Sequence, residues 1–244
     1  DAKQKLKTGL EVGSESPVSE YALELDNPWL YEEYLSKDLT TFMENYWKRN
    51  YLSGHWLSDH FPQRLYIGNS FCHLLFPKED QLFLLLEKAR KESLQVTLTF
   101  SYIREFMLEN TGQLIEKLEN WCEENKVILE IQVNDWAMAD LLTDFPHLHP
   151  ILGVLINKRR KDPRLSYKKG ELSALSENSI NADFYRNFLA ETCRITRYEE
   201  ESCGYLPELS EGKHSLHLPF YQTNTSQYCP LYARCKRGSR GAQT

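Results

Sequence analysis

Short β-rich runs alternate along most of the chain with longer segments whose apolar residues recur at helical spacing. Runs rich in β-branched and aromatic residues predict strands. Six of them cover residues 64–68, 95–101, 127–133, 151–157, 194–200 and 214–221, and a seventh strand is expected at 20–25. Each run ends in small or polar residues, which is typical of the point where a strand passes into a loop.

The segments between these strands predict amphipathic helices. Leu82, Leu85, Leu86 and Ala89 share one face of a helix over 79–93. The same spacing predicts helices over 103–124, 136–142 and 181–192, with one or two packing helices inside 28–62. The aromatic stripe of 28–62 is interpreted as part of the core, and residues 1–18 as a polar lead-in.

Strands that alternate with helices indicate parallel pairing, because a parallel connection needs a crossover of roughly a dozen residues or more. A closed barrel and an open doubly wound sheet both satisfy this order. We expect an α/β fold with an incomplete, TIM-barrel-like (β/α) barrel in residues 63–244, after an N-terminal arm and helical extension in residues 1–62. The barrel is preferred because the chain runs into a basic, glycine-containing tail where further strands would be expected.

Composition and charge narrow the functional classes. The chain of 244 residues is 41% hydrophobic, which is enough for a substantial core. It has neither an apolar run of about 18 residues nor a signal-peptide layout, so we expect no membrane span and a cytoplasmic location. A net charge of −6 argues against nonspecific electrostatic binding of nucleic acid.

Both candidate architectures place ligands at the carboxyl ends of their strands. Asn134 and Asp135 follow the third of the six strands, and Lys158, Arg159 and Arg160 follow the fourth. We interpret these five residues as candidate substrate-binding residues, because a guanidinium matches carboxylate and phosphate oxygens. The alternative for the basic run is a solvated surface segment.

Six cysteines are too few for a disulfide scaffold in a chain of this size. Cys122 and Cys193 fall in or at the end of predicted helices, where free cysteines are usually buried hydrophobic residues. The other four follow predicted strands and are candidate metal ligands, namely Cys72, Cys203, Cys229 and Cys235. Thiolates are the ligands that iron–sulfur clusters prefer.

The run RLYIGNSFC at 64–72, its following helix and the strand that ends at Asn134 and Asp135 resemble the collagenase-like peptidase family U thirty-two. In that family a strand reading roughly VYLGE begins the active face, and a cysteine follows it closely in the quinone-hydroxylation members. Asn69 stands where the family usually has Glu. The stretch 214–235 is similar to the point where members begin their cysteine cluster, so the resemblance covers about residues 64–235.

This resemblance implies a barrel that carries a four-iron (4Fe-4S) cluster. It implies Cys72, Cys229 and Cys235 as ligands, with Cys203 or a residue outside the given chain as the fourth. Several members perform oxygen-independent hydroxylation of RNA bases or of a quinone precursor. The expected partners are therefore a small anionic or aromatic substrate, RNA, or a related protein subunit.

Two other functions stay open, and catalytic residues are not assigned. The chain could be a metal-free peptidase or hydrolase that uses Asp135, Glu199 and Glu201 as acid–base groups. The peptidase label is the family's historical one, but neither a Ser-His-Asp order at strand ends nor an HExxH motif supports it. The chain could also be a non-catalytic partner subunit that docks another protein through segment 28–62.

Overall fold

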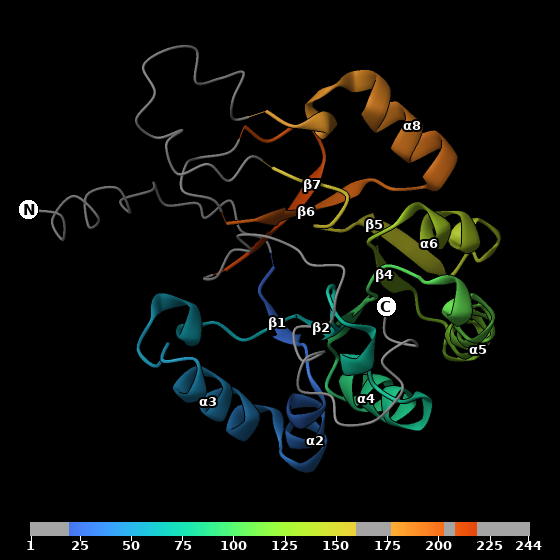
Figure 1. Cartoon of the computed structure of the whole chain (residues 1–244). Coiled ribbons are helices and arrows are strands. Elements are labelled where there is room, and N and C mark those ends of the chain that lie inside the picture. Colours follow the sequence, from blue (N-terminus) through green and yellow to red (C-terminus); the bar gives the residue numbers. More distant parts are fainter. Residues whose placement is uncertain (1–19, 160–176, 203–207, 219–244) are drawn as a thin grey trace, which may run out of the picture.

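One curled sheet organises the chain in a computed structural model, which describes residues 20–159, 177–202 and 208–218. Seven strands lie side by side in sequence order, and every neighbouring pair is parallel. The sheet bends into a half-barrel with helices on its outer side (Figure 1). The predicted α/β fold with parallel pairing is thus confirmed, whereas the polar lead-in at 1–18 lies outside the described residues.

The strands match the hydrophobic pattern closely. Their bounds are β1 Ala22–Leu25, β2 Arg64–Gly68, β3 Gln95–Thr99, β4 Leu129–Val133, β5 Leu148–Leu152, β6 Arg197–Glu201 and β7 Lys213–His217. The seventh strand expected at 20–25 is confirmed as β1, which pairs in register with β2. Residues 22–25 therefore belong to the same sheet as the rest of the strands.

The strand predicted at 151–157 is wrong in its position. Strand β5 ends at Leu152, and residues 153–157 form a turn in which the Asn157 N–H donates to the Gly153 carbonyl at 3.0 Å. Pro150 made the preceding segment resemble a loop, because proline cannot donate a ladder hydrogen bond. It is tolerated here because the register between β5 and β6 comprises Leu152 and Tyr198 alone.

Helices connect most of the strands. They are α2 Pro28–Ser36, α3 Leu39–Arg49, α4 Glu79–Lys91, α5 Leu108–Asn125, α6 Trp136–Leu141 and α8 Asp183–Cys193, with short 3-10 turns at Trp56–Asp59, His73–Leu75, Glu105–Met107, Leu142–Asp144 and Ser179–Asn181. Asn27, Asp38 and Asp135 accept hydrogen bonds from the first-turn N–H groups of α2, α3 and α6. These side-chain caps explain where the three helices begin.

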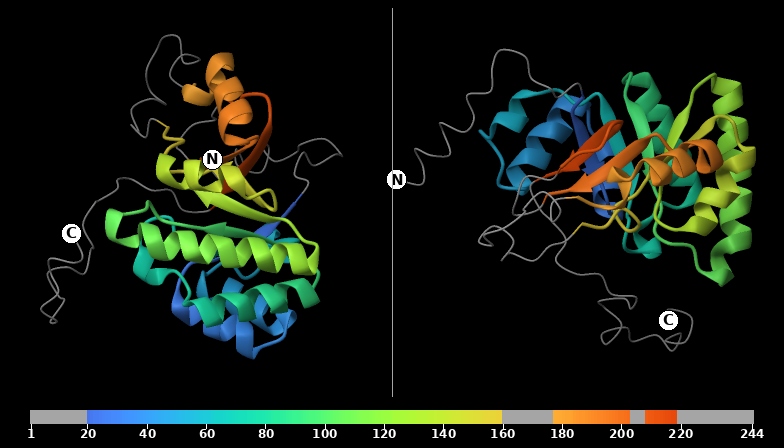
Figure 2. Two further views of the ribbon diagram at one scale, coloured as in Figure 1. Left: turned by 90° about the vertical axis from the view of Figure 1, so that its right-hand side faces the viewer. Right: turned by 90° about the horizontal axis from the view of Figure 1, so that it is seen from above.

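Alternate residues of each strand face opposite layers, and the outer layer is apolar from β1 to β5, whereas Glu200 of β6 and His214 of β7 form a polar pair on that side. Leu65 and Ile67 of β2 pack with Leu82, Leu85 and Leu86 of α4 in one continuous core. Tyr34 and Phe42 of the aromatic stripe are fully buried in the same core, as predicted, whereas Trp29 is 54% exposed and is covered by Arg49. Figure 2 shows α4, α5 and α6 along the outer side of the sheet. None of the helices in the described ranges has the length and apolar character needed to cross a bilayer.

Gly68 is required where β2 ends. Its φ of +121° lies in a region that favours glycine, and a Cβ atom at this position would overlap the carbonyl oxygen of Thr99 on β3. The close approach of the two backbones allows the Asn69 N–H to donate to that oxygen at 3.0 Å. Gly68 therefore sets the path of the chain as it leaves the sheet.

We expect Gly68→Ala to lower the free energy of unfolding by about 2–4 kcal/mol, because it adds both backbone strain and a clash with Thr99. The matched control is Gly112→Ala in α5, where a Cβ meets nothing within 4 Å. Alanine favours the helix there, so the control should be neutral or stabilising by up to about 1 kcal/mol. Urea denaturation of both variants checks this, and equal stabilities would contradict it.

Candidate functional site

A side-chain-supported turn holds Cys72 at the carboxyl edge of the sheet. The Asn69 side-chain oxygen accepts hydrogen bonds from the N–H groups of Phe71 and Cys72, each at 2.9 Å. The amide of Asn69 donates to the Asp26 carbonyl at 3.1 Å, which joins the turn to the end of β1. Such side-chain-to-backbone bonds fix the turn locally. Cys72 is a half-buried free thiol in this fixed position.

Asn134 and Asp135 join neighbouring strand ends. Asn134 donates to the Phe100 carbonyl at 2.7 Å and accepts from the Leu155 N–H at 3.1 Å. Asp135 caps α6 and accepts from the Ile103 N–H at 2.6 Å. Both side chains thus have a structural role at the edge where sites form. Their assignment to substrate binding stays a prediction.

The basic run has one buried member. Arg159 is 7% exposed, and its Nε donates to Glu200 Oε2 at 2.6 Å, while Lys158 is exposed. Burial raises the pKa of Glu200, but hydrogen bonds from His214 and Arg159 outweigh it and hold that pKa below its ordinary value. The ion pair between Arg159 and Glu200 therefore connects the segment after β5 to strand β6. Binding of an anionic substrate by this run stays a prediction, and Arg160 lies outside the described residues.

The cysteines separate into two groups. Cys122 and Cys193 are buried, as predicted. Burial raises the pKa of Cys122 to about 12, so it is a neutral thiol and a poor metal ligand at neutral pH. Cys203, Cys229 and Cys235 lie outside the described residues. Within the described ranges, no three His, Cys, Asp or Glu side chains are grouped in a way that could hold a metal ion.

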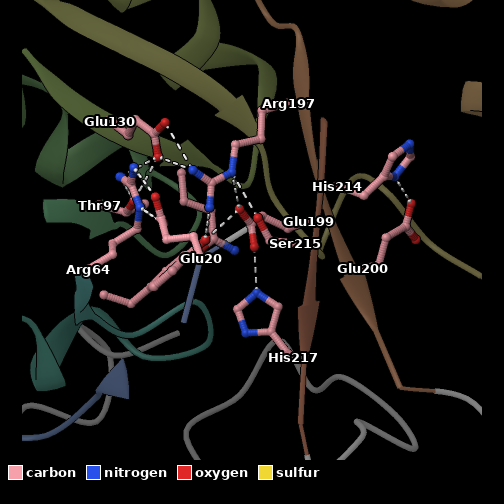
Figure 3. Close-up of polar contacts among 12 residues, drawn as sticks. Glu20, Arg64, Thr97, Glu130, Arg197, Glu199, Glu200, His214, Ser215 and His217 are labelled. Carbon is pink, nitrogen blue, oxygen red and sulfur yellow. Dashed lines mark hydrogen bonds and ion pairs between the residues drawn. The ribbon is translucent and has the colours of Figure 1, made fainter. Parts of the chain in front are cut away.

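The inner face of the half-barrel carries a connected polar network centred on Glu130 (Figure 3). Glu130 accepts from Arg64 Nη1 at 2.7 Å and from Arg197 Nη1 at 2.8 and 3.0 Å. Thr97 donates to the same carboxylate at 2.9 Å, and Glu20 is ion-paired with Arg64. One carboxylate on β4 therefore joins charged side chains of β2 and β6.

The network continues toward β7 through Arg197. This guanidinium donates to Tyr66 Oη at 2.7 Å and to Ser215 Oγ at 2.8 Å. Tyr66 in turn donates to Glu199 Oε1 at 2.9 Å, and Glu199 Oε2 lies 2.7 Å from His217 Nε2. Figure 3 shows Arg197, Glu199, Ser215 and His217 along the inner side of β6 and β7. The hydrogen bonds run from β2 across to the last described strand.

Burial and charge shift the pKa values in this network. Burial lowers the pKa of His217, but its hydrogen bond to Glu199 and the charges of Glu199 and Glu24 raise it to about 10. Burial and the charge of Glu199 raise the pKa of Tyr66 well above its ordinary value. At neutral pH, His217 is therefore a cation and Tyr66 a neutral hydrogen-bond donor.

Most of this network was not predicted from the sequence, where Glu199 is the only one of these inner residues proposed for a functional role. The signal was present as polar residues at every second position. Arg64 and Tyr66 alternate with Leu65 and Ile67 in β2, and Arg197 and Glu199 alternate with Tyr198 in β6. A period of two places such residues on one face of a strand.

Comparison with known proteins leaves the chain without an assigned family. It matches no protein-family model and no curated protein sequence. The resemblance to family U thirty-two therefore rests on the residues quoted above. Any function has to be argued from the turn at Cys72 and from the inner network.

We expect Glu130→Gln to lower the free energy of unfolding by about 2–4 kcal/mol, because it leaves Arg64 and Arg197 without the carboxylate they share. Glu116→Gln is the matched control on the exposed face of α5, and it should stay within about 0.5 kcal/mol of the wild type. Urea denaturation at neutral pH measures both. Equal stability of the two variants would show that Glu130 has no structural importance.

Proposed function

We propose that the chain is an iron–sulfur protein of the hydroxylase type, with a four-iron cluster at the carboxyl edge of an incomplete, TIM-barrel-like (β/α) barrel. The observation that carries this proposal is the turn built by Asn69, which fixes a free thiol directly after β2. The carboxyl ends of parallel strands are where barrels of this kind form their sites. The short sequence resemblance points to the same cysteine.

The donor chemistry of Cys72 suits such a cluster. It is half-buried and free, so it is accessible to metal, unlike the enclosed Cys122. Cys229 and Cys235 are the proposed second and third ligands, and Cys203 or a residue outside the given chain is the fourth. None of these other ligands lies within the described residues, and their assignment rests on the resemblance alone.

The proposed reaction class is oxygen-independent hydroxylation or a related modification of a small aromatic substrate. A bound cluster would supply electron transfer. The residues of this chain would bind and orient the polar part of the substrate. The candidates for that role are the residues predicted at the carboxyl edge, Asn134, Asp135 and the basic run that begins at Lys158. The net charge of −6 favours a small substrate over RNA, whose phosphates need clustered basic residues.

The metal-free hydrolase has less support from the contacts of its proposed acid–base groups. Asp135 caps α6, and Glu199 is held by Tyr66 and His217. Both carboxylates already have several hydrogen-bond partners inside the protein. For the partner-subunit alternative, Tyr34 and Phe42 of segment 28–62 are core residues, whereas Trp29, Trp56 and Phe61 are exposed. Docking of another protein through this segment therefore stays a prediction.

Removing the Cys72 thiol should abolish cluster binding. We expect anaerobically purified wild-type protein to contain iron and sulfide with visible absorbance, and Cys72→Ala to lose most of both. Cys122→Ala is the control, because that buried thiol should affect only packing, by about 1 kcal/mol, and leave the colour unchanged.

Iron content, sulfide content and the visible spectrum are compared at equal protein concentration. Thermal denaturation of the metal-free forms establishes that both variants fold. Wild-type protein that takes up no iron under anaerobic reconstitution would end the iron–sulfur proposal. Unchanged iron binding by a folded Cys72→Ala variant would remove Cys72 from the ligand set.

A further inference from the structure

His217 contacts three other strands from the last described position of the sheet. Its Nε2 lies 2.7 Å from Glu199 on β6, and its Nδ1 lies 3.9 Å from Glu24 Oε1 on β1. Its ring meets Tyr66 of β2 edge-on, with centroids 5.5 Å apart. Among the described strands, β1 and β7 are the two edges of the sheet and share no register pair. One side chain thus spans the seam between both edges.

A positive charge is what allows this side chain to serve both carboxylates. A neutral imidazole has no net charge and can serve Glu199 alone, whereas the imidazolium donates to Glu199 at 2.7 Å and also attracts the Glu24 carboxylate at 3.9 Å through its charge. In the neutral state, one ring lone pair would face a carboxylate across the seam. The contact between the edges therefore depends on the protonated ring.

The surrounding charges favour that protonated state. On the inner face, the carboxylates of Glu20, Glu24, Glu130 and Glu199 lie near the guanidiniums of Arg64 and Arg197. Glu201, the register partner of His217 on β6, adds a fifth carboxylate on this face, so carboxylates outnumber these guanidiniums. Glu24 of β1, Glu199 of β6 and the aromatic ring of Tyr66 of β2 face the imidazole directly, and Arg197 lies 3.7 Å from Glu199.

We propose that His217 is a charge-dependent latch that closes the seam between β1 and β7 and so controls access to the polar interior of the half-barrel. Loss of its proton leaves Glu24 and Glu199 without the cation between them. The two edges then separate, and the interior network around Tyr66 and Arg197 becomes accessible to solvent. This latch goes beyond the proposed cluster chemistry and does not depend on it.

The sign of the pH dependence follows from the raised pKa. A histidine whose pKa is higher in the folded state than in the unfolded state stabilises the folded state. This contribution is complete at pH values below the unfolded-state pKa of about 6.5, and it is lost as the pH rises toward the folded-state pKa. For His217 that value is about 10. The seam is therefore closed at neutral pH, and it opens progressively between neutral pH and about pH 10.

Hydrogen exchange of the whole chain tests the latch at the two strands that it joins, β1 and β7. In His217→Gln, we expect backbone amides of Ala22–Leu25 and Lys213–His217 to exchange roughly tenfold faster at pH 7 than in the wild type, while Leu129–Val133 is unchanged. Glu24→Gln keeps the pair between His217 and Glu199, so it tests the seam contact alone and should accelerate exchange in β1. His149→Gln, at an exposed position of β5, is the control and should have no effect.

The pH dependence is tested by measuring hydrogen exchange of the same backbone amides, in the same variants, over a range of pH. Raising the pH should accelerate exchange in the wild-type edge strands beyond the intrinsic rate increase, and this extra acceleration should be absent in His217→Gln. Equal edge protection in the wild type and Glu24→Gln at neutral pH would overturn the latch. So would the same extra acceleration in His217→Gln. Neither outcome bears on iron binding, so failure of the latch is distinguishable from failure of the cluster.

Discussion

The carboxylate of Glu130, shared between Arg64 and Arg197, is the interaction on which the inner face of the sheet depends. A buried guanidinium is costly unless it is paired and hydrogen-bonded, and this pairing joins β2, β4 and β6 across the concave side. The barrel interiors that are best known are filled by branched apolar side chains. Here the inner layer is polar, so its strands are held by charge complementarity and hydrogen bonds rather than by apolar packing. The apolar contribution comes from the outer layer, where leucines of the strands meet the helices.

The strands thus carry polar side chains toward the inner face and contribute most of the apolar packing on the outer face. The outer core fixes the positions of the strands, and side chains such as Asn69 and Asn134 then join the strand ends to one another. In the described part of this edge, side-chain hydrogen bonds hold the turns that follow β2 and β4. Such hydrogen bonds can hold a thiol such as Cys72 in one position, which is a general requirement for a metal ligand. The polar interior lies on the amino side of that edge and offers oriented donors.

The fold was largely predictable, because the outer layer follows simple periodicities. Leu82, Leu85, Leu86 and Ala89 marked α4, and β-rich runs marked the strands within a few residues. The exception was β5, where Pro150 concealed a strand that tolerates it owing to its minimal pairing with β6. The candidate site was predictable only in part. The position of Cys72 after β2 was clear, whereas the partners of Arg159 and of Asn134 come from distant segments and could not be deduced from spacing.

The sequence by itself determined the order of the elements and the parallel pairing, because these depend on local periodicity and on connection length. Only the tertiary structure decided which polar residues meet. Tyr66 and Glu199 are 133 positions apart, and their contact exists because the sheet curls and brings β6 opposite β2. The same curl sets His217 against Glu24. Curvature is a property of the whole packed sheet, so no local pattern of residues encodes it.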